Sequence, residues 1–326
     1  IWICGIGMVA FITPGFLAPD GDEAKFSFQE RKFQQRIALW TPVVAVGLYL
    51  ILTLVILISS IDSIQFAAHE LYGAPFIAAV MIAFVMWSIR DKPKRVFAFL
   101  VSLPLIFVIA WLFGNSLGYD STDILGASLS RGQIGMVVLL PALMAVPATF
   151  SLMRENSEKK KIPFFAHFIH LGLVLLVIGH IMSTTIIDRG TYEHSVTLIK
   201  DEKVEWGGYE FEFVDVVTET EGLEVGDGYL GAVINVYEDG ELIDTVEPGV
   251  IRFDSRARSE VDRVTTWHGD IVLIMDGTQA RSLMEGSDLV RIMVYDLPGI
   301  HLVWGGWSLM LLASLAIWAP RRHPTD

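Results

Sequence analysis

The sequence predicts an α-helical polytopic membrane protein of about seven spans, with an extracytoplasmic antiparallel β domain inserted before the last span. Hydrophobic residues make up 52% of the 326 residues and the mean hydropathy is +0.50, which is too apolar for a soluble domain of this length. The apolar residues stand in long blocks, and about 20 such residues cross a bilayer as a helix. Residues 187–297 break the pattern with acidic, strand-like sequence.

The apolar blocks define the expected spans and three regions of the chain. Residues 1–186 are expected to form a bundle of six spans, 187–297 a β-rich domain, and 298–326 the final span and a tail. Residues 1–17 start within an apolar block and lack a basic leading segment, so they are not interpreted as a signal peptide and a longer chain is expected. The expected spans are 1–17, 38–59, 75–89, 96–114, 133–153, 163–186 and 299–319.

Basic residues predict the orientation in the cytoplasmic membrane, because Lys and Arg are enriched in short cytoplasmic loops. They gather in alternate connections and in the tail, whereas the loops 61–74 and 115–131 contain only Arg131. The N-terminus and 187–297 are therefore expected outside, and the C-terminus in the cytoplasm. The clustered residues are Lys25, Arg31, Lys32, Arg36, Arg90, Lys92, Lys94, Arg95, Arg154, Lys159, Lys160, Lys161, Arg321 and Arg322.

The segment 187–297 combines an acidic surplus with strand-like sequence. It carries 25 acidic and 9 basic residues, so the chain's net charge of −13 arises there, which argues against a nucleic-acid partner. Runs such as EFEFVDVV and DIVLIMDG are rich in β-branched and aromatic residues, partly in alternation. The pair Asp239-Gly240 between two such runs predicts a tight hairpin. A small antiparallel sandwich or barrel-like domain is expected.

Three histidines in the expected span 163–186 are the candidate site. Ionisable residues are costly within a bilayer and usually face the bundle interior or a cofactor. His170 lies about 10 Å into the span, whereas His180 lies about 15 Å further and is turned by about 80°, so one metal ion cannot take both. His170 with the small Gly172 beside it suits haem, which accepts histidine at iron. The alternative is a hydrogen bond from His170 to another helix. Zinc is a weaker candidate for this site than haem, because no Cys or carboxylate nearby completes a tetrahedral set of ligands.

Several blocks in order resemble the CcmF family, the membrane haem lyases of cytochrome c biogenesis. HLGLVLLVIGHIMSTT, from His170, resembles the family's HLGLAxxxIGI…S span, and YEFEFV resembles the start of its outer segment. VRIMVYDLPGIHLVWGGWSLMLLASLAIWAPRR, from Val290, resembles its closing motif VRxYYKPxxxWIWxGGxLMxxGGLLA…PRxR. Upstream, FSFQERKFQQRIALWTPVVAVGLYLILT and GAPFIAAVMIAFVMW resemble two further family stretches. The likeness covers nearly the whole chain and corresponds to the family's C-terminal half.

The resemblance implies a b-type haem in the membrane, with His170 as one axial ligand of its iron. It also implies haem delivery by a CcmE-like chaperone, attachment to apocytochrome c, and CcmH/CcmI-like partners that handle the apocytochrome. The family's Trp-rich haem loop is absent from the chain, and its other haem histidines belong to segments upstream of Ile1. An N-terminal half or subunit is therefore expected as a partner, and this chain alone is not expected to catalyse. The alternative function is a non-catalytic membrane anchor or assembly subunit that presents an acidic β domain.

The remaining polar candidates receive no cofactor role. His69 is expected in a solvated outer loop, His167 at the membrane boundary, and His194 and His268 on the β domain's surface. His301 is expected at the start of the last span, where a contact with a haem propionate is the alternative, and the role of His180 is open. The basic island of the β domain is expected to pair with neighbouring acids, or else with propionates. Its members are Arg252, Arg256, Arg258 and Arg263.

Overall fold

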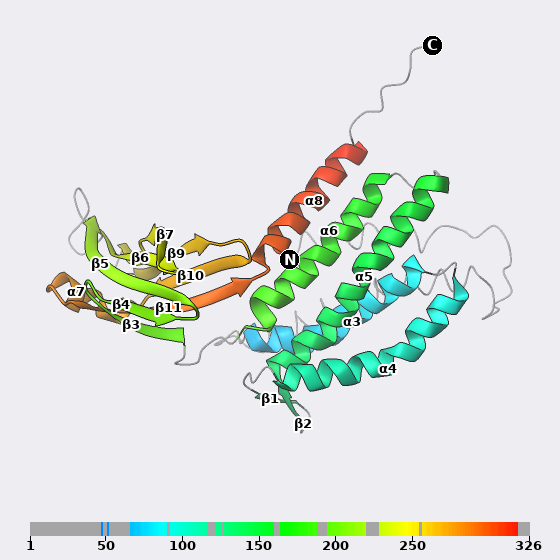
Figure 1. Cartoon of the computed structure of the whole chain (residues 1–326), viewed down its shortest axis with the longest axis horizontal. Coiled ribbons are helices and arrows are strands. Elements are labelled where there is room, and N and C mark those ends of the chain that lie inside the picture. Colours follow the sequence, from blue (N-terminus) through cyan, green and yellow to red (C-terminus); the bar gives the residue numbers. More distant parts are fainter. Residues whose placement is uncertain are drawn as a thin grey trace, which may run out of the picture. The chain divides into compact units, whose positions relative to one another are not determined.

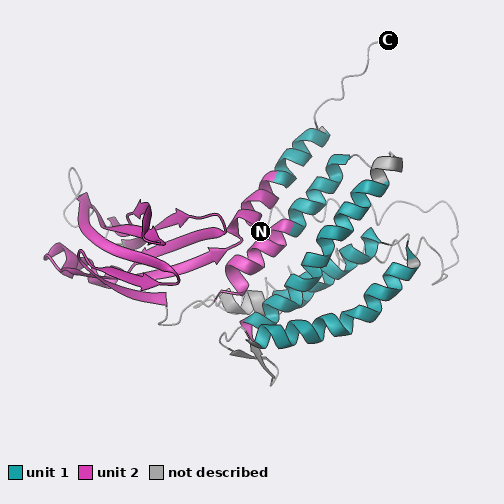
Figure 2. Cartoon of the chain, viewed as in Figure 1, with its two compact units in different colours: residues 1–118, 132–174, 309–326 teal, residues 119–131, 175–308 magenta. Residues whose placement is uncertain are grey.

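The computed structural model of the chain contains, among its described residues, five apolar helices and an antiparallel β domain (Figure 1). The predicted spans 1–17 and 38–59 lie outside the described residues, apart from two single positions. The described residues are 47, 51, 66–89, 92–116, 121–124, 127–159, 164–187, 194–219, 228–253 and 256–318. The chain divides into two compact units, 1–118 with 132–174 and 309–326, and 119–131 with 175–308 (Figure 2).

Four of the described helices are long and apolar enough to cross a membrane. Their apolar stretches are Lys94–Asn115, Arg131–Glu155, Phe164–Thr185 and Ile300–Ile317, which match the fourth to seventh predicted spans. The predicted span 75–89 lies in α3, whose apolar part, Gly73–Ser88, is shorter. The helices are α3 (Phe66–Ser88), α4 (Pro93–Ser116), α5 (Arg131–Lys159), α6 (Phe164–His180), continued by the π-helical turn η1 (Ile181–Thr185), and α8 (Ile300–Trp318).

Within the first unit, a close approach at Gly114 and one ion pair join the two ends of α4 to those of α5. Ala142 and Ala145 of α5 are fully buried, and such small side chains allow helices to approach closely. A Cβ on Gly114, near the end of α4, would meet the backbone of Gln133 at 2.4 Å, so only glycine fits there. At the opposite ends of these helices, Lys92 pairs with Glu155.

The β domain is one antiparallel sheet in the order β3-β11-β10-β9-β8-β6-β5-β4, with β7 also pairing with β6. Its edges curl toward one another, because Lys200 forms a bridge with Phe213 and the Asp201 N–H donates to the Phe213 carbonyl at 2.9 Å. The strands are β3 (Ser195–Ile199), β4 (Lys203–Trp206), β5 (Tyr209–Glu219), β6 (Gly228–Glu238), β7 (Glu241–Val246), β8 (Gly249–Phe253), β9 (Arg256–Thr265), β10 (Gly269–Met275) and β11 (Leu289–Pro298).

One hydrophobic core fills the inside of this curled sheet. Alternate residues of the strands point inward, as the period-two pattern predicts, and are fully or almost fully buried. The largest of these side chains are Leu198, Phe211, Phe213, Ile234, Ile271, Leu273, Met275 and Ile292. Because residues from all parts of the sheet contribute to one cluster, the domain is stabilised mainly by burial of apolar surface.

Local signals in the sequence predicted some turns and missed others. The Asp239-Gly240 hairpin between β6 and β7 is confirmed, with φ of 52° and 80° at its two turn residues. A short ladder of β1 (Ser121–Ile124) with β2 (Ala127–Ser130), and the short helix α7 (Ala280–Met284), were not predicted. The expected loop around His69 is wrong, because Phe66 begins α3 and the neighbouring Ala67, Ala68 and Leu71 favour helix.

Candidate functional site

His170 lies in α6 and faces aromatic side chains of α3. Its ring centroid is 5.5 Å from that of Trp87, with the two rings nearly perpendicular, and 5.4 Å from that of Phe84. Phe84 and Trp87 are three residues apart on α3, so their side chains lie on one face of that helix. The imidazole therefore sits beside an apolar aromatic wall supplied by a neighbouring helix.

His167 lies on the same side of α6, one turn before His170. The spacing of three residues brings their ring centroids to 6.1 Å. His167 is fully buried, with an exposed fraction of 0%. The expectation that it lies near the membrane boundary concerns its depth in the bilayer and stays a prediction.

The Nδ1 atom of His170 is buried and lacks a hydrogen-bond partner among the described residues, although the residue as a whole is partly exposed. Unsatisfied buried polar atoms are rare and need an explanation, for which a redox role or an absent ligand are recognised cases. An imidazole that holds iron has its second nitrogen fixed by another group. The described residues thus give this partly buried imidazole an apolar aromatic wall, and they leave its Nδ1 without the partner that would fix the ring of an iron-holding imidazole.

The other histidine of α6, His180, does not join this group. Its side chain is exposed and its carbonyl accepts a hydrogen bond from Thr184. The helix changes directly after it to the π turn η1, a form that is often found at functional sites. In the described part of the chain, no three His, Cys, Asp or Glu side chains lie close enough to hold a metal ion by themselves.

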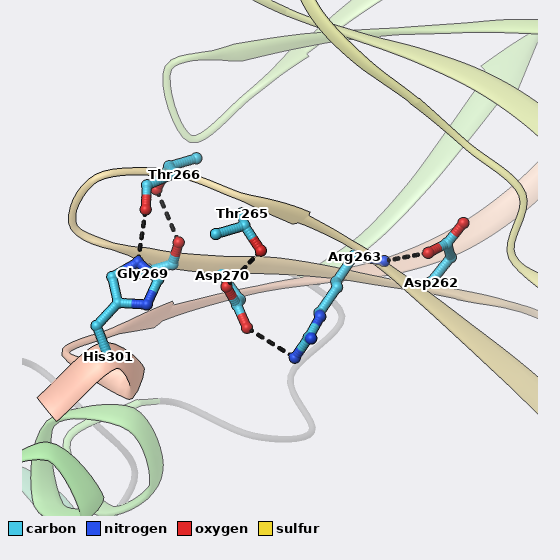
Figure 3. A network of polar contacts seen from close by, with 7 residues as sticks. All are labelled: Asp262, Arg263, Thr265, Thr266, Gly269, Asp270 and His301. Carbon is cyan, nitrogen blue, oxygen red and sulfur yellow. Dashed lines mark hydrogen bonds and ion pairs between the residues drawn. The ribbon is translucent and has the colours of Figure 1, made fainter. Parts of the chain in front are cut away.

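A second polar region lies where β9, β10 and the start of α8 meet (Figure 3). His301 donates from Nε2 to the Thr266 carbonyl at 2.6 Å, and the Gly299 N–H donates to the His268 carbonyl at 2.8 Å. His301 thus ties the β9–β10 turn to α8, a structural role. His268 lies 3.6 Å from the carboxylate of Asp296, beyond hydrogen-bond range, and burial raises the pKa of Asp296 above its ordinary value.

Two arginines of the basic island, Arg258 and Arg263, pair with acids. Arg263 donates to Asp270 at 3.2 Å, and Thr265 donates to the other oxygen of this buried carboxylate at 3.0 Å (Figure 3). Arg258 pairs with Glu260 at 3.3 Å. His194 donates from Nδ1 to the Val294 carbonyl and stacks on Tyr295, with ring centroids 4.9 Å apart. These contacts match the expected pairing with neighbouring acids and give His194 a structural role.

Sequence reasoning found His170 but missed the aromatic residues around it. Phe84 and Trp87 stand three residues apart in an apolar helix, a pattern too common to indicate a site. It also missed Gly179 of α6, where a Cβ would lie 2.7 Å from both the Gly299 carbonyl oxygen and the Val303 nitrogen. That contact makes Gly179 the point at which the end of α6 meets the start of α8.

The apolar helices and the antiparallel sheet define a multi-pass membrane protein that carries a β domain. Among solved structures, the chain is similar to the cytochrome c haem lyase CcmF, with a TM-score of 0.60 and 17% sequence identity. The match covers 88% of this chain and 46% of that chain, so this chain spans just under half of that length. No family model and no curated protein sequence matches. The likeness establishes the fold and confirms the resemblance drawn from the sequence blocks.

Proposed function

We propose that this chain is the C-terminal part of a CcmF-like haem lyase complex, which takes haem from a chaperone and supports its covalent attachment to apocytochrome c. The observation that carries the proposal is the environment of His170, within a fold shared with CcmF along 88% of the chain. The imidazole has an aromatic wall on one side and a buried nitrogen without a partner among the described residues.

In this proposal His170 would hold a membrane b-type haem through its iron, together with a ligand from the partner half. Phe84 and Trp87 offer an apolar surface for a flat macrocycle and exclude water from the imidazole. A haem held there would supply electron transfer. A neutral imidazole has a nitrogen lone pair that can bind iron. No acid or base of this chain is assigned a part in thioether formation.

The β domain is proposed to be the surface on which partners dock. The candidates are a CcmE-like haem chaperone, apocytochrome c and CcmH/CcmI-like proteins that present its thiols. The acidic surplus of the domain would favour basic surfaces on these partners. The alternative function, a non-catalytic anchor that presents this acidic domain, makes no use of His170.

The test replaces His170 with Ala and measures haem in the chain purified together with the remaining half of the assembly. After reduction with dithionite, we expect the wild type to show the absorption spectrum of a b-type haem. His170→Ala should lose most of this absorption. His180→Ala is the matched control, because it removes an exposed imidazole from the same helix and should keep the spectrum. A parallel titration of the haem-free protein with hemin gives the affinity directly.

Two results would contradict the assignment. Wild-type haem content and affinity in His170→Ala would remove the ligand role. A wild type that binds no haem, even with its partner half present, would favour the anchor alternative. Circular dichroism of each variant, compared with the wild type, separates the loss of a ligand from the loss of the fold.

A further inference from the structure

We propose that Trp267, at the tip of the β9–β10 turn, inserts into the phospholipid headgroup region of the membrane that α8 enters, and thereby fixes the β domain at the bilayer surface. Trp267 is 87% exposed, the highest value among the large hydrophobic side chains that the structure describes as exposed. Indoles are enriched at membrane interfaces, where the ring leaves water while its N–H stays hydrated.

The turn that carries Trp267 is fastened to the first residues of α8. The Thr266 carbonyl, directly before Trp267, accepts from His301 Nε2 (Figure 3). The His268 carbonyl, directly after Trp267, accepts from the Gly299 N–H. A Cβ on Gly269 would meet the Leu297 carbonyl oxygen at 2.3 Å, so the turn lies directly against β11. The position of Trp267 is therefore set by the start of α8.

The length of the apolar stretch in α8 places the start of this helix at the membrane boundary. Its apolar stretch is the 18 residues Ile300–Ile317, and Arg321 and Arg322 follow soon after it in the sequence. Eighteen residues at 1.5 Å each extend about 27 Å, slightly less than the hydrocarbon thickness of about 30 Å. The whole stretch is needed to cross, so Ile300 lies at the edge of the hydrocarbon, and a turn bonded to Gly299 and His301 lies at the level of the headgroups.

The neighbouring side chains have the chemistry of this layer. Trp and Tyr are enriched at membrane interfaces, where the ring is in an apolar medium and its polar group stays hydrated. Tyr295, three residues before Pro298, stacks on His194, whose ring centroid is 5.8 Å from that of Trp206. Trp267 itself packs edge-on against His268 at 5.2 Å, which limits its freedom before insertion. A lipid interface therefore fits this end of the domain better than bulk water does.

The first experiment labels single cysteines in the full chain. Cys4 is the only cysteine, so a Cys4→Ser background makes each new one unique. A nitroxide at Trp267→Cys is compared with one at Met284→Cys, which is 63% exposed and lies on α7, beyond the opposite ends of β10 and β11. Both proteins are reconstituted into vesicles of phosphatidylcholine with a minority of phosphatidylglycerol. The ratio of oxygen to nickel-chelate accessibility should be several-fold higher at position 267.

The second experiment keeps the native side chain. Vesicles that contain lipids brominated near the headgroup quench interfacial indoles, and the signal of Trp267 is obtained as wild type minus Trp267→Phe. We expect this difference signal to be strongly quenched. Equal chelate accessibility at positions 267 and 284, or an unquenched difference signal, would overturn the proposal and leave Trp267 facing water or a protein partner. Neither measurement depends on haem binding.

Discussion

Two carboxylates of the β domain have opposite electrostatic environments. Asp276 accepts from the N–H and the hydroxyl of Thr278 at 3.0 and 2.7 Å, and these bonds hold its pKa below the ordinary value. Asp296 is partly buried, and burial raises its pKa despite the nearby His268. The folded state thus favours the ionised form at position 276 and disfavours it at position 296.

The pH dependence of unfolding should show this difference in sign. For Asp296 the raised pKa means that stability is fully present below the unfolded-state pKa, about 3.9, and is lost as the pH rises through the folded-state pKa. Asn cannot ionise, so Asp296→Asn removes this loss of stability at higher pH. The variant should therefore unfold at the same or a higher temperature than the wild type at neutral pH, and the difference should disappear in acid. Thermal unfolding of the purified chain in detergent, followed by circular dichroism, measures it.

Asp276→Ala is the control of opposite sign. It removes the side chain that caps the short 3₁₀ helix at Gly277–Gln279, which costs about 1 kcal/mol in comparable cases. This loss should be largest at neutral pH and shrink in acid, where the carboxylate is protonated. If Asp296→Asn lowered stability at neutral pH as Asp276→Ala does, the contact with His268 would outweigh the cost of burial.

At the scale of elements, the crossing of α6 and α8 depends on the absence of a side chain. At Gly179 a Cβ would lie 2.7 Å from backbone atoms of Gly299 and Val303, so a substitution must move one helix. Gly179→Val should destabilise the protein by about 1–3 kcal/mol, as overpacking does elsewhere. The same thermal unfolding assay, carried out in lipid nanodiscs, gives the shift in midpoint.

Gly305→Ala in α8 is the matched control, because a Cβ there meets nothing within 4 Å in the described part of the chain. Alanine also favours helix over glycine by about 1 kcal/mol. This variant should keep or raise the midpoint. A Gly179→Val protein as stable as Gly305→Ala would show that the two helices do not need to approach so closely.

The sequence predicted the elements whose signals are local. Apolar length gave the four spans, and the pair Asp239-Gly240 with alternating neighbours gave the β6–β7 hairpin. The prediction of an outer loop around His69 was wrong, because the residues there favour helix and belong to α3. The aromatic wall of His170 could not be predicted, because the pairing of α3 with α6 is a tertiary contact. The same holds for buried His167 and for the edges of the sheet that curl together.

At the scale of the whole molecule, the predicted orientation in the cytoplasmic membrane can be tested directly. The basic loops predict that the β domain lies outside and that the C-terminus lies in the cytoplasm. In the Cys4→Ser background, a membrane-impermeant maleimide should label Glu241→Cys in intact cells. Thr325→Cys should be labelled only after the cells are permeabilised. The reverse pattern would contradict the orientation, and equal labelling of both in intact cells would point to leaky cells or mixed insertion.

The overall likeness to CcmF was visible in the order of several weak sequence blocks. With 17% identity, each block alone is compatible with chance, and the structural match supports their joint interpretation. The match also covers 46% of the other chain, in agreement with the expectation that only half of that architecture is present.

The two ends of the β domain lie side by side, because β3, its first strand, pairs with β11, its last, and Ser195 lies opposite Met293. The polypeptide thus arrives and departs at one spot, and everything between is a self-contained cassette with its own core. Such an insertion point tolerates exchange of the intervening fold where the replacement also supplies carbonyls for the Gly299 N–H and for His301. Transplanting a foreign sheet here should leave the bilayer-embedded helices undisturbed while changing which soluble proteins they meet.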